Sequence, residues 1–207
     1  MKQGGWQVNV EYFDDYVIKT PKTKKEIIER VKSYLKSKGK LEELDKRVKD
    51  MQEDWKFSIS LIKKKKFPSE LIGNIEFLKD GKIKQSRAIV LEDILKRVYK
   101  EKKINELKRI ISQTLDLILE LWKYGIVEKT SKIGSEMGIV NGKVILIDIG
   151  ELSNRKDIAE RQINNKKWYK DLNERFGEDI ANIFMNLAEK KLTLKVLNDN
   201  WDIKRKG

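Results

Sequence analysis

The residues of this chain that are best suited to chemistry are a glycine pair, a lysine and an aspartate. Gly4 and Gly5 precede a run of alternating residues, and a flexible turn of this kind lets backbone N–H groups approach a phosphate closely. Lys19 and Asp148 each close a short apolar run. A lysine fixed on a strand acts as a point charge for phosphate oxygens. An aspartate that follows a buried strand can hold Mg²⁺, so these residue types indicate phosphate or metal-assisted chemistry.

The composition excludes several other kinds of catalysis. The chain has 207 residues, enough for one domain or two small lobes around a real core, and it contains no Cys and no His. Without Cys it has no disulfide scaffold, thiolate zinc site or cysteine nucleophile. Without His it has no Ser-His-Asp triad and no histidine-ligated metal. Carboxylates, Lys, Tyr, Ser, Thr and backbone dipoles remain, and phosphoryl transfer can run on positioned charge of this kind.

The net charge of +13, from 46 Lys+Arg against 33 Asp+Glu, allows two interpretations. Clustered Lys and Arg would release counterions from a nucleic-acid backbone. Here the basic residues are spread along the chain, with the densest run at Lys63–Lys66, and Lys- and Glu-rich composition is also typical of proteins from high-temperature organisms. We therefore expect mainly a solvated lysine surface, which would also attract a nucleotide, and nucleic acid is the less favoured partner.

Hydrophobic periodicity predicts an α+β fold in which strands dominate the first part and helices the last. Thr23 and Glu26 form a capping-box pattern, Asn141-Gly142 is a hairpin turn signal, and Gly125 is a plausible residue just beyond a helix end. The expected strands cover residues 6–13, 16–19, 71–78, 82–91 and the hairpin 138–148. The expected helices cover residues 23–38, 41–55, 104–122 and 157–197, with a polar loop at 126–137 and breaks at Gly39 and Gly177.

At these positions the chain resembles the protein-kinase-like superfamily. Val17-Ile18-Lys19 is similar to the family's Val-Ala-Ile-Lys strand, and Asp148-Ile149-Gly150 is similar to its Asp-Phe-Gly motif, with Ile for Phe. The resemblance covers most of the chain by the order of its elements. It implies a two-lobed kinase-like fold, with a strand-rich N-lobe at 1–91 that contains an inserted helix pair, and a small helical C-lobe at 92–207. It also implies ATP and Mg²⁺ as cofactors.

The resemblance implies a role for each candidate residue of the nucleotide and metal site. The implied roles are phosphate contacts from Gly4, Gly5 and Lys19, a carboxylate partner for Lys19 from Glu29 or Glu26, hinge contacts to adenine from Leu91, Glu92 and Asp93, and metal ligation by Asp148 and Glu136. The position that orients the acceptor falls near Ser131 on the family's usual spacing, and Glu128 takes this role if the loop is about three residues longer. Each residue also has a structural interpretation. Lys19 can be a solvated strand end, Asp148 a turn residue, and Gly4-Gly5 a frayed terminus. The five Trp residues are expected to pack in the core or between the lobes and not to stack on bases.

The chain departs from the kinase pattern at several points. The His-Arg-Asp…Asn loop is missing, and residues 125–136 take its place. The glycine turn has too little chain before it for a full first strand, and the part after Asp148 lacks an Ala-Pro-Glu segment. These departures favour a minimal kinase of small molecules or a catalytically inactive pseudokinase over a kinase of protein substrates. A basic nucleic-acid-binding protein is the third interpretation. No secretory leader or membrane span is expected, which favours a cytoplasmic protein.

Overall fold

Residues 2–205 are described in a computed structural model, and their first element is an antiparallel sheet of five strands. The sheet has the order β1-β2-β3-β5-β4. Its strands are β1 (Lys2–Gly4), β2 (Val8–Tyr12), β3 (Tyr16–Pro21), β4 (Glu76–Phe77) and β5 (Ile83–Ser86). Strands β2 and β3 form the hairpin predicted at 6–19.

The register of this sheet decides which way Lys19 points. In β3 burial alternates, with Val17 and Lys19 buried and Ile18 half-buried. Lys19 lies opposite Ile83 of β5, which is also buried, whereas Ile18 lies opposite Lys84. Because successive residues of a strand face opposite sides, Lys19 is directed into the molecule and Lys84 lies on the other face.

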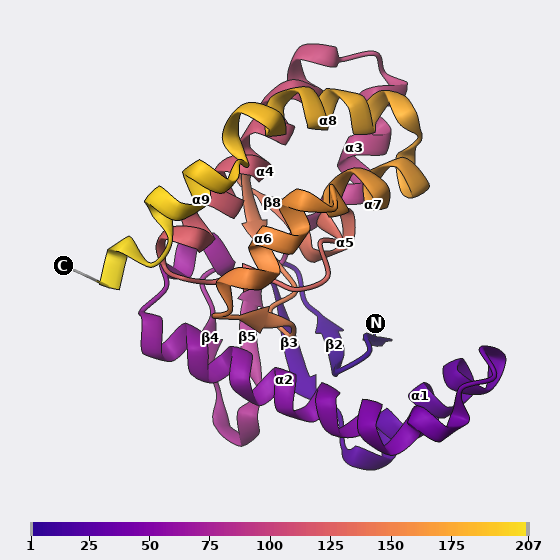
Figure 1. Cartoon of the computed structure of the whole chain (residues 1–207). Helices are drawn as coiled ribbons and strands as arrows, with labels where there is room; N and C mark the ends of the chain where they lie inside the picture. Colours follow the sequence, from indigo (N-terminus) through magenta and orange to yellow (C-terminus); the bar gives the residue numbers. More distant parts are fainter. Residues whose placement is uncertain (1, 206–207) are drawn as a thin grey trace.

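A pair of helices follows the hairpin, as the sequence predicts. Helix α1 (Lys24–Ser37) begins with the expected capping box between Thr23 and Glu26, and α2 (Leu44–Lys65) follows a short 3₁₀ turn. The two helices pack on each other through a small separate core of five buried residues, namely Ile27, Val31, Leu35, Val48 and Met51. Figure 1 shows α2 running along the sheet while α1 projects to one side.

The second half of the chain combines helices with short strand pairs. A three-stranded sheet has the order β6-β8-β9, and β7 pairs with β10. These strands are β6 (Ile89–Val90), β7 (Val127–Glu128), β8 (Met137–Val140), β9 (Lys143–Leu146) and β10 (Leu152–Ser153). The helices are α3 (Leu91–Lys100), α4 (Ile104–Lys123), α5 (Ile133–Glu136), α6 (Lys156–Asn164), α7 (Lys167–Phe176), α8 (Glu178–Lys191) and α9 (Leu194–Asn200).

Helix α4 is the centre of the main core. The predicted apolar stripe at 104–122 buries Leu107, Ile111, Leu115 and Trp122, and the helix ends before Gly125 at φ 64°. Helices α8 and α9 pack against it. The buried cluster runs on from there to β2 and β5 of the first sheet, so one core joins both halves of the molecule. In Figure 1 the sheet and α2 lie below, and α3, α4, α7 and α8 lie above.

The α+β class is confirmed, and four local predictions are corrected. Residues 2–4 form β1, so the glycine turn does have a strand before it. The strand expected at 82–91 ends at Ser86, because β6 joins a different sheet and Leu91 begins α3. Of the strand expected at 71–78, only the two residues of β4 form a strand, and a 3₁₀ turn at Ser69–Ile72 precedes them. The expected loop at 126–137 contains β7 and α5, because Ile126, Val127 and Ile133 are buried.

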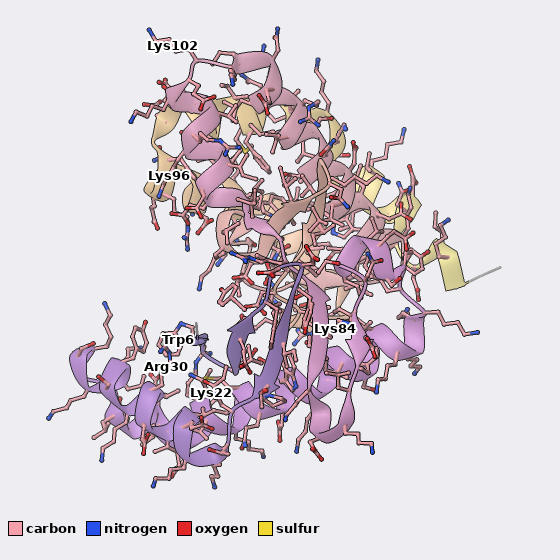
Figure 2. The ribbon with its side chains drawn as sticks, turned by 180° about the vertical axis from the view of Figure 1, so that it is seen from behind. Trp6, Lys22, Arg30, Lys84, Lys96 and Lys102 are labelled. Atoms are coloured by element: carbon pink, nitrogen blue, oxygen red, sulfur yellow. The ribbon has the colours of Figure 1, made fainter. Side chains whose placement is uncertain are left out.

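Of the five Trp residues, Trp6 lies outside the buried core. Trp122, Trp168 and Trp55 are buried, whereas Trp6 is 44% exposed. Its ring meets Tyr34 edge to face at 5.3 Å, and Arg30 lies over it at 5.1 Å. Figure 2 shows Trp6, Lys22 and Arg30 close together between the N-terminal turn and α1. Trp6 therefore belongs to an open groove of about 600 Å³ rather than to the core.

Within the described part of the chain, every helix is too short or too polar to cross a lipid bilayer.

Candidate functional site

Lys19 and the segment around Asp148 meet at the centre of the molecule. The Lys19 ammonium donates a hydrogen bond to the backbone carbonyl of Ile147, which lies 128 positions further along the chain. Burial lowers the pKa of Lys19, while the negative charges of Asp148 and Glu136 act in the opposite direction. The solvated strand-end interpretation of Lys19 is therefore wrong, because this lysine is only 8% exposed and faces two carboxylates.

Glu136 is tied to the same segment through its backbone. Its carbonyl accepts the N–H groups of Ile147 at 2.8 Å and Asp148 at 3.1 Å. Burial, together with the nearby carboxylates of Asp148 and Glu128, raises the pKa of the Glu136 carboxyl to about 9. The raised pKa favours the protonated form of the Glu136 carboxyl when no cation is bound.

Asp148 shapes the turn that follows β9. Its Oδ1 accepts the N–H of Gly150 at 2.9 Å, so the turn interpretation of this residue is confirmed. The turn directs Ile149 into the core, where it is fully buried. A local turn bond does not exclude a ligand role, because a carboxylate has a second oxygen and further lone pairs.

Glu128 lies on β7, beside Glu136 in space. Its two carboxylate oxygens accept the backbone N–H groups of Thr130 at 2.6 Å and Ser131 at 2.7 Å. Burial raises the pKa of Glu128 to about 7, although these hydrogen bonds oppose the shift. Ser131 has φ 62° and a buried hydroxyl without a hydrogen-bond partner, and it shares a small cavity of about 20 Å³ with Glu128 and Glu136.

The glycine turn reaches this centre through Gln7, which the sequence analysis missed. Gly4 pairs with Asn9 in the sheet, and the Gly5 N–H donates to the Val8 carbonyl at 2.9 Å. From this turn the Gln7 amide donates to the carbonyls of Met51 at 3.1 Å and Gly150 at 3.3 Å. The turn is therefore held against the segment that carries Asp148.

Replacing Gly150 by Ala is expected to lower the free energy of unfolding by about 1–2 kcal/mol. An added Cβ would collide with the Gln7 amide oxygen, so Gln7 must turn away and lose hydrogen bonds that contribute about 1 kcal/mol each. Urea denaturation of wild type, Gly150→Ala, Gln7→Ala and the double variant measures this. In the Gln7→Ala background the added methyl should cost almost nothing, and an equal cost in both backgrounds would contradict the contact.

Neither carboxylate expected as the partner of Lys19 is near it. Among the described side chains, Lys19 makes no ion pair within 4 Å to Glu26 or Glu29. Glu26 closes the capping box and accepts a hydrogen bond from Asn9 at 2.8 Å. Glu29 is exposed on α1 in the groove beside Trp6. Helix α1 packs mainly on α2, and among the described residues the carboxylates whose charge acts on Lys19 are Asp148 and Glu136.

The three residues expected at an adenine-binding hinge form the first turn of α3. Leu91 is fully buried, and Asp93 is exposed. Glu92 binds Lys96 at 2.6 Å and Arg175 at 2.9 Å, and the hydrogen bond from Lys96 is the main cause of its lowered pKa. In this structure the Glu92 side chain links α3 to α7 through Arg175.

A second contact that the sequence analysis missed joins α2 to the site. Lys129, next to Glu128, forms an ion pair with Asp54 of α2 at 2.6 Å, and its N–H donates to the Glu151 carbonyl at 3.0 Å. Burial raises the pKa of Glu151 as well. No spacing rule predicts this pair, because Asp54 and Lys129 come from elements far apart in the sequence.

Metal binding by the protein alone is not supported. Among the described residues, no group of three or more Asp and Glu side chains has a geometry that could hold a metal ion. The carboxylates of Asp148 and Glu136 do lie close enough to repel each other. Mg²⁺ is commonly held by one or two carboxylates together with substrate phosphates, so this pair fits a metal that arrives with its ligand.

Comparison with known proteins adds no family to this description. No protein-family model matches the chain, and a search of curated proteins finds no significant match. The fold and the site therefore define an α+β protein with a buried lysine–carboxylate centre.

Proposed function

We propose that this chain is a kinase-like protein that binds ATP with Mg²⁺ and transfers the γ-phosphoryl group to a small-molecule acceptor. The observation that carries the proposal is the meeting of Lys19 with the Ile147–Asp148 segment. A buried lysine facing two carboxylates is the arrangement that a phosphate–metal complex needs, with positive charge for the phosphates and oxygen ligands for the metal.

Each part of the centre supports one task in this proposal. Lys19 would pair with the phosphates, and the backbone N–H groups of the turn at Gly4 and Gly5 would approach them. Asp148 and Glu136 would hold Mg²⁺, which would neutralise phosphate charge. The pKa of Glu128, about 7, suits a group that takes a proton from an acceptor hydroxyl near neutral pH.

ATP is expected to raise the melting temperature of the wild-type protein, and Mg²⁺ is expected to increase the shift. A ligand at a hundred times its dissociation constant contributes about 2.7 kcal/mol to folding, a shift that differential scanning fluorimetry detects easily. Lys19→Met and Asp148→Asn should abolish most of the shift, because they remove the phosphate and metal contacts.

The matched control is Lys84→Met on the neighbouring strand. Lys84 of β5 pairs with Ile18, so its side chain lies on the face of the sheet opposite to that of Lys19. Figure 2 labels Lys84. Lys84→Met should keep the full nucleotide shift. A wild-type protein that shows no shift, or equal shifts in Lys19→Met and Lys84→Met, would contradict the proposal.

A catalytically inactive pseudokinase is the second candidate, and one observation favours it. Lys19 lacks an ion pair with either expected helix carboxylate, and that pair normally fixes the lysine for phosphoryl transfer. This candidate predicts nucleotide binding without turnover. Single-turnover measurements with labelled ATP and a panel of small hydroxyl and amine acceptors separate the two, because only a kinase forms labelled product.

A further inference from the structure

The C-terminal turn of α2 and the last described residues of the chain line one hollow, far from the centre described above. Its volume is about 210 Å³, several times the roughly 30 Å³ that one water molecule occupies in the liquid. The hollow is lined by Lys64, Lys65, Lys66, Tyr124, Asp202 and Lys204. The densest basic run of the sequence and the lysine near the chain end therefore meet at one place.

The walls of this hollow are fixed by contacts within the protein. Lys66 ends α2 in a left-handed conformation, at φ 47°, so the lysine run turns around the helix end. Lys65 is largely buried and pairs with Asp202 at 2.5 Å. The Asp202 N–H donates to the Trp122 carbonyl at 2.9 Å. The ring of Tyr124 packs edge-on against Phe67. The chain end is thus anchored beside α2.

The charge of the hollow is strongly positive. Lys65 is compensated by Asp202, whereas Lys64, Lys66 and Lys204 are exposed and form no ion pair within 4 Å among residues 2–205. Three of the lysines that line the hollow therefore have no acidic partner within 4 Å among the described residues, although Glu70 and Glu120 act on the neighbouring Tyr124. Lys63 next to them lies over the ring of Phe77 at 4.3 Å and extends the basic surface toward β4.

We propose that this surface, formed by Lys63–Lys66 and Lys204, binds the phosphate backbone of a nucleic acid without sequence preference. Lysine ammonium groups are point charges that contact phosphates and read no bases. The hollow is large enough for one phosphate group, and the lysines around the hollow can contact the neighbouring phosphates of the same nucleic-acid strand. The net charge of +13 draws a polyanion toward the protein from a distance.

The test is fluorescence anisotropy with a labelled mixed-sequence RNA across a range of salt concentrations. The variant Lys64→Glu/Lys66→Glu/Lys204→Glu should bind about tenfold more weakly than wild type near 0.1 M salt. The slope of log affinity against log salt should fall by about 2, because each lost contact to a single strand contributes about 0.7. Lys19→Met should bind the RNA like wild type, so this result is independent of the proposed function.

The control variant reverses the charge of three exposed lysines outside the hollow and changes the net charge by the same amount. It is Lys100→Glu/Lys108→Glu/Lys143→Glu. It should weaken binding only about twofold through the general field. Equal weakening by both triple variants would overturn the proposal, as would no RNA binding by wild type. Phosphatidylserine vesicles are a parallel probe, and stronger site-dependent binding to them than to RNA would also overturn it.

Discussion

Replacing Glu136 by Gln is expected to stabilise the ligand-free protein by about 3 kcal/mol at pH 8.5, because the change removes an ionisable carboxyl from a buried position. The carboxyl is packed among other carboxylates, which with burial raise its pKa from 4.5 to about 9. A pKa shift of one unit corresponds to about 1.36 kcal/mol, and only part of the shift is counted because the side chain is partly exposed. Gln reproduces the protonated form at every pH.

The direction of the pH dependence follows from proton binding. Between pH 4.5 and about 9 the folded protein holds a proton on Glu136 that the unfolded chain has released. The free energy of unfolding contributed by this group therefore falls as the pH rises through that window. Wild type should lose stability between pH 5 and 9 relative to Glu136→Gln, and the two proteins should be nearly equal at pH 5.

Urea denaturation at several pH values measures this difference. Glu29→Gln is the matched control, because Glu29 is exposed on α1 and the same atoms change. The free energy of unfolding of Glu29→Gln, plotted against pH, should run parallel to that of wild type. A parallel curve for Glu136→Gln would show that the Glu136 carboxyl has no raised pKa. It would then remove the electrostatic evidence that Glu136 and Asp148 lie close together.

Truncating Trp122 to Ala is expected to lower the free energy of unfolding by about 4 kcal/mol. The indole is 1% exposed near the end of α4, inside the main core, and loss of a buried aromatic side chain costs about 3–5 kcal/mol. Trp6→Ala is the control, since Trp6 is 44% exposed, with its ring in a T-shaped contact with Tyr34 and Arg30 over it. It should cost about 1 kcal/mol.

Thermal or urea unfolding of both variants compares the two positions. The backbone carbonyl of Trp122 accepts the Asp202 N–H beside the basic hollow, and this hydrogen bond does not need the indole. Because neither substitution removes a lysine that lines the hollow, both variants should bind RNA like wild type at temperatures where they are folded. Similar losses of stability in both variants would show that the core is not centred on α4.

The sequence was sufficient for elements that depend on near neighbours. Thr23 and Glu26 lie three positions apart and form the capping box that their spacing predicts. Asn141-Gly142 turns between β8 and β9 with both residues at positive φ. The stripe at 104–122 becomes α4, because residues spaced by three and four share a helix face and bury together.

Predictions failed where a distant part of the chain determines the outcome. The run at 82–91 alternates like one strand, yet it divides between two sheets because β8 pairs with its end. Glu26 and Glu29 had suitable spacing after Lys19, but α1 packs mainly on α2, and Glu26 bonds Thr23 and Asn9 instead. Trp6 is apolar like the other Trp residues and still lies at an open groove.

The sequence by itself determined the α+β class, the hairpins, the main helices and the residue types available for chemistry. Only the tertiary structure decided that Lys19 is buried beside Asp148 and Glu136, that Gln7 rests on Gly150, and that the lysines of α2 meet the chain end. The physical reason is the range of the interactions. Caps, turns and helix stripes are set by residues a few positions apart, whereas burial and charge at these sites come from residues more than a hundred positions away.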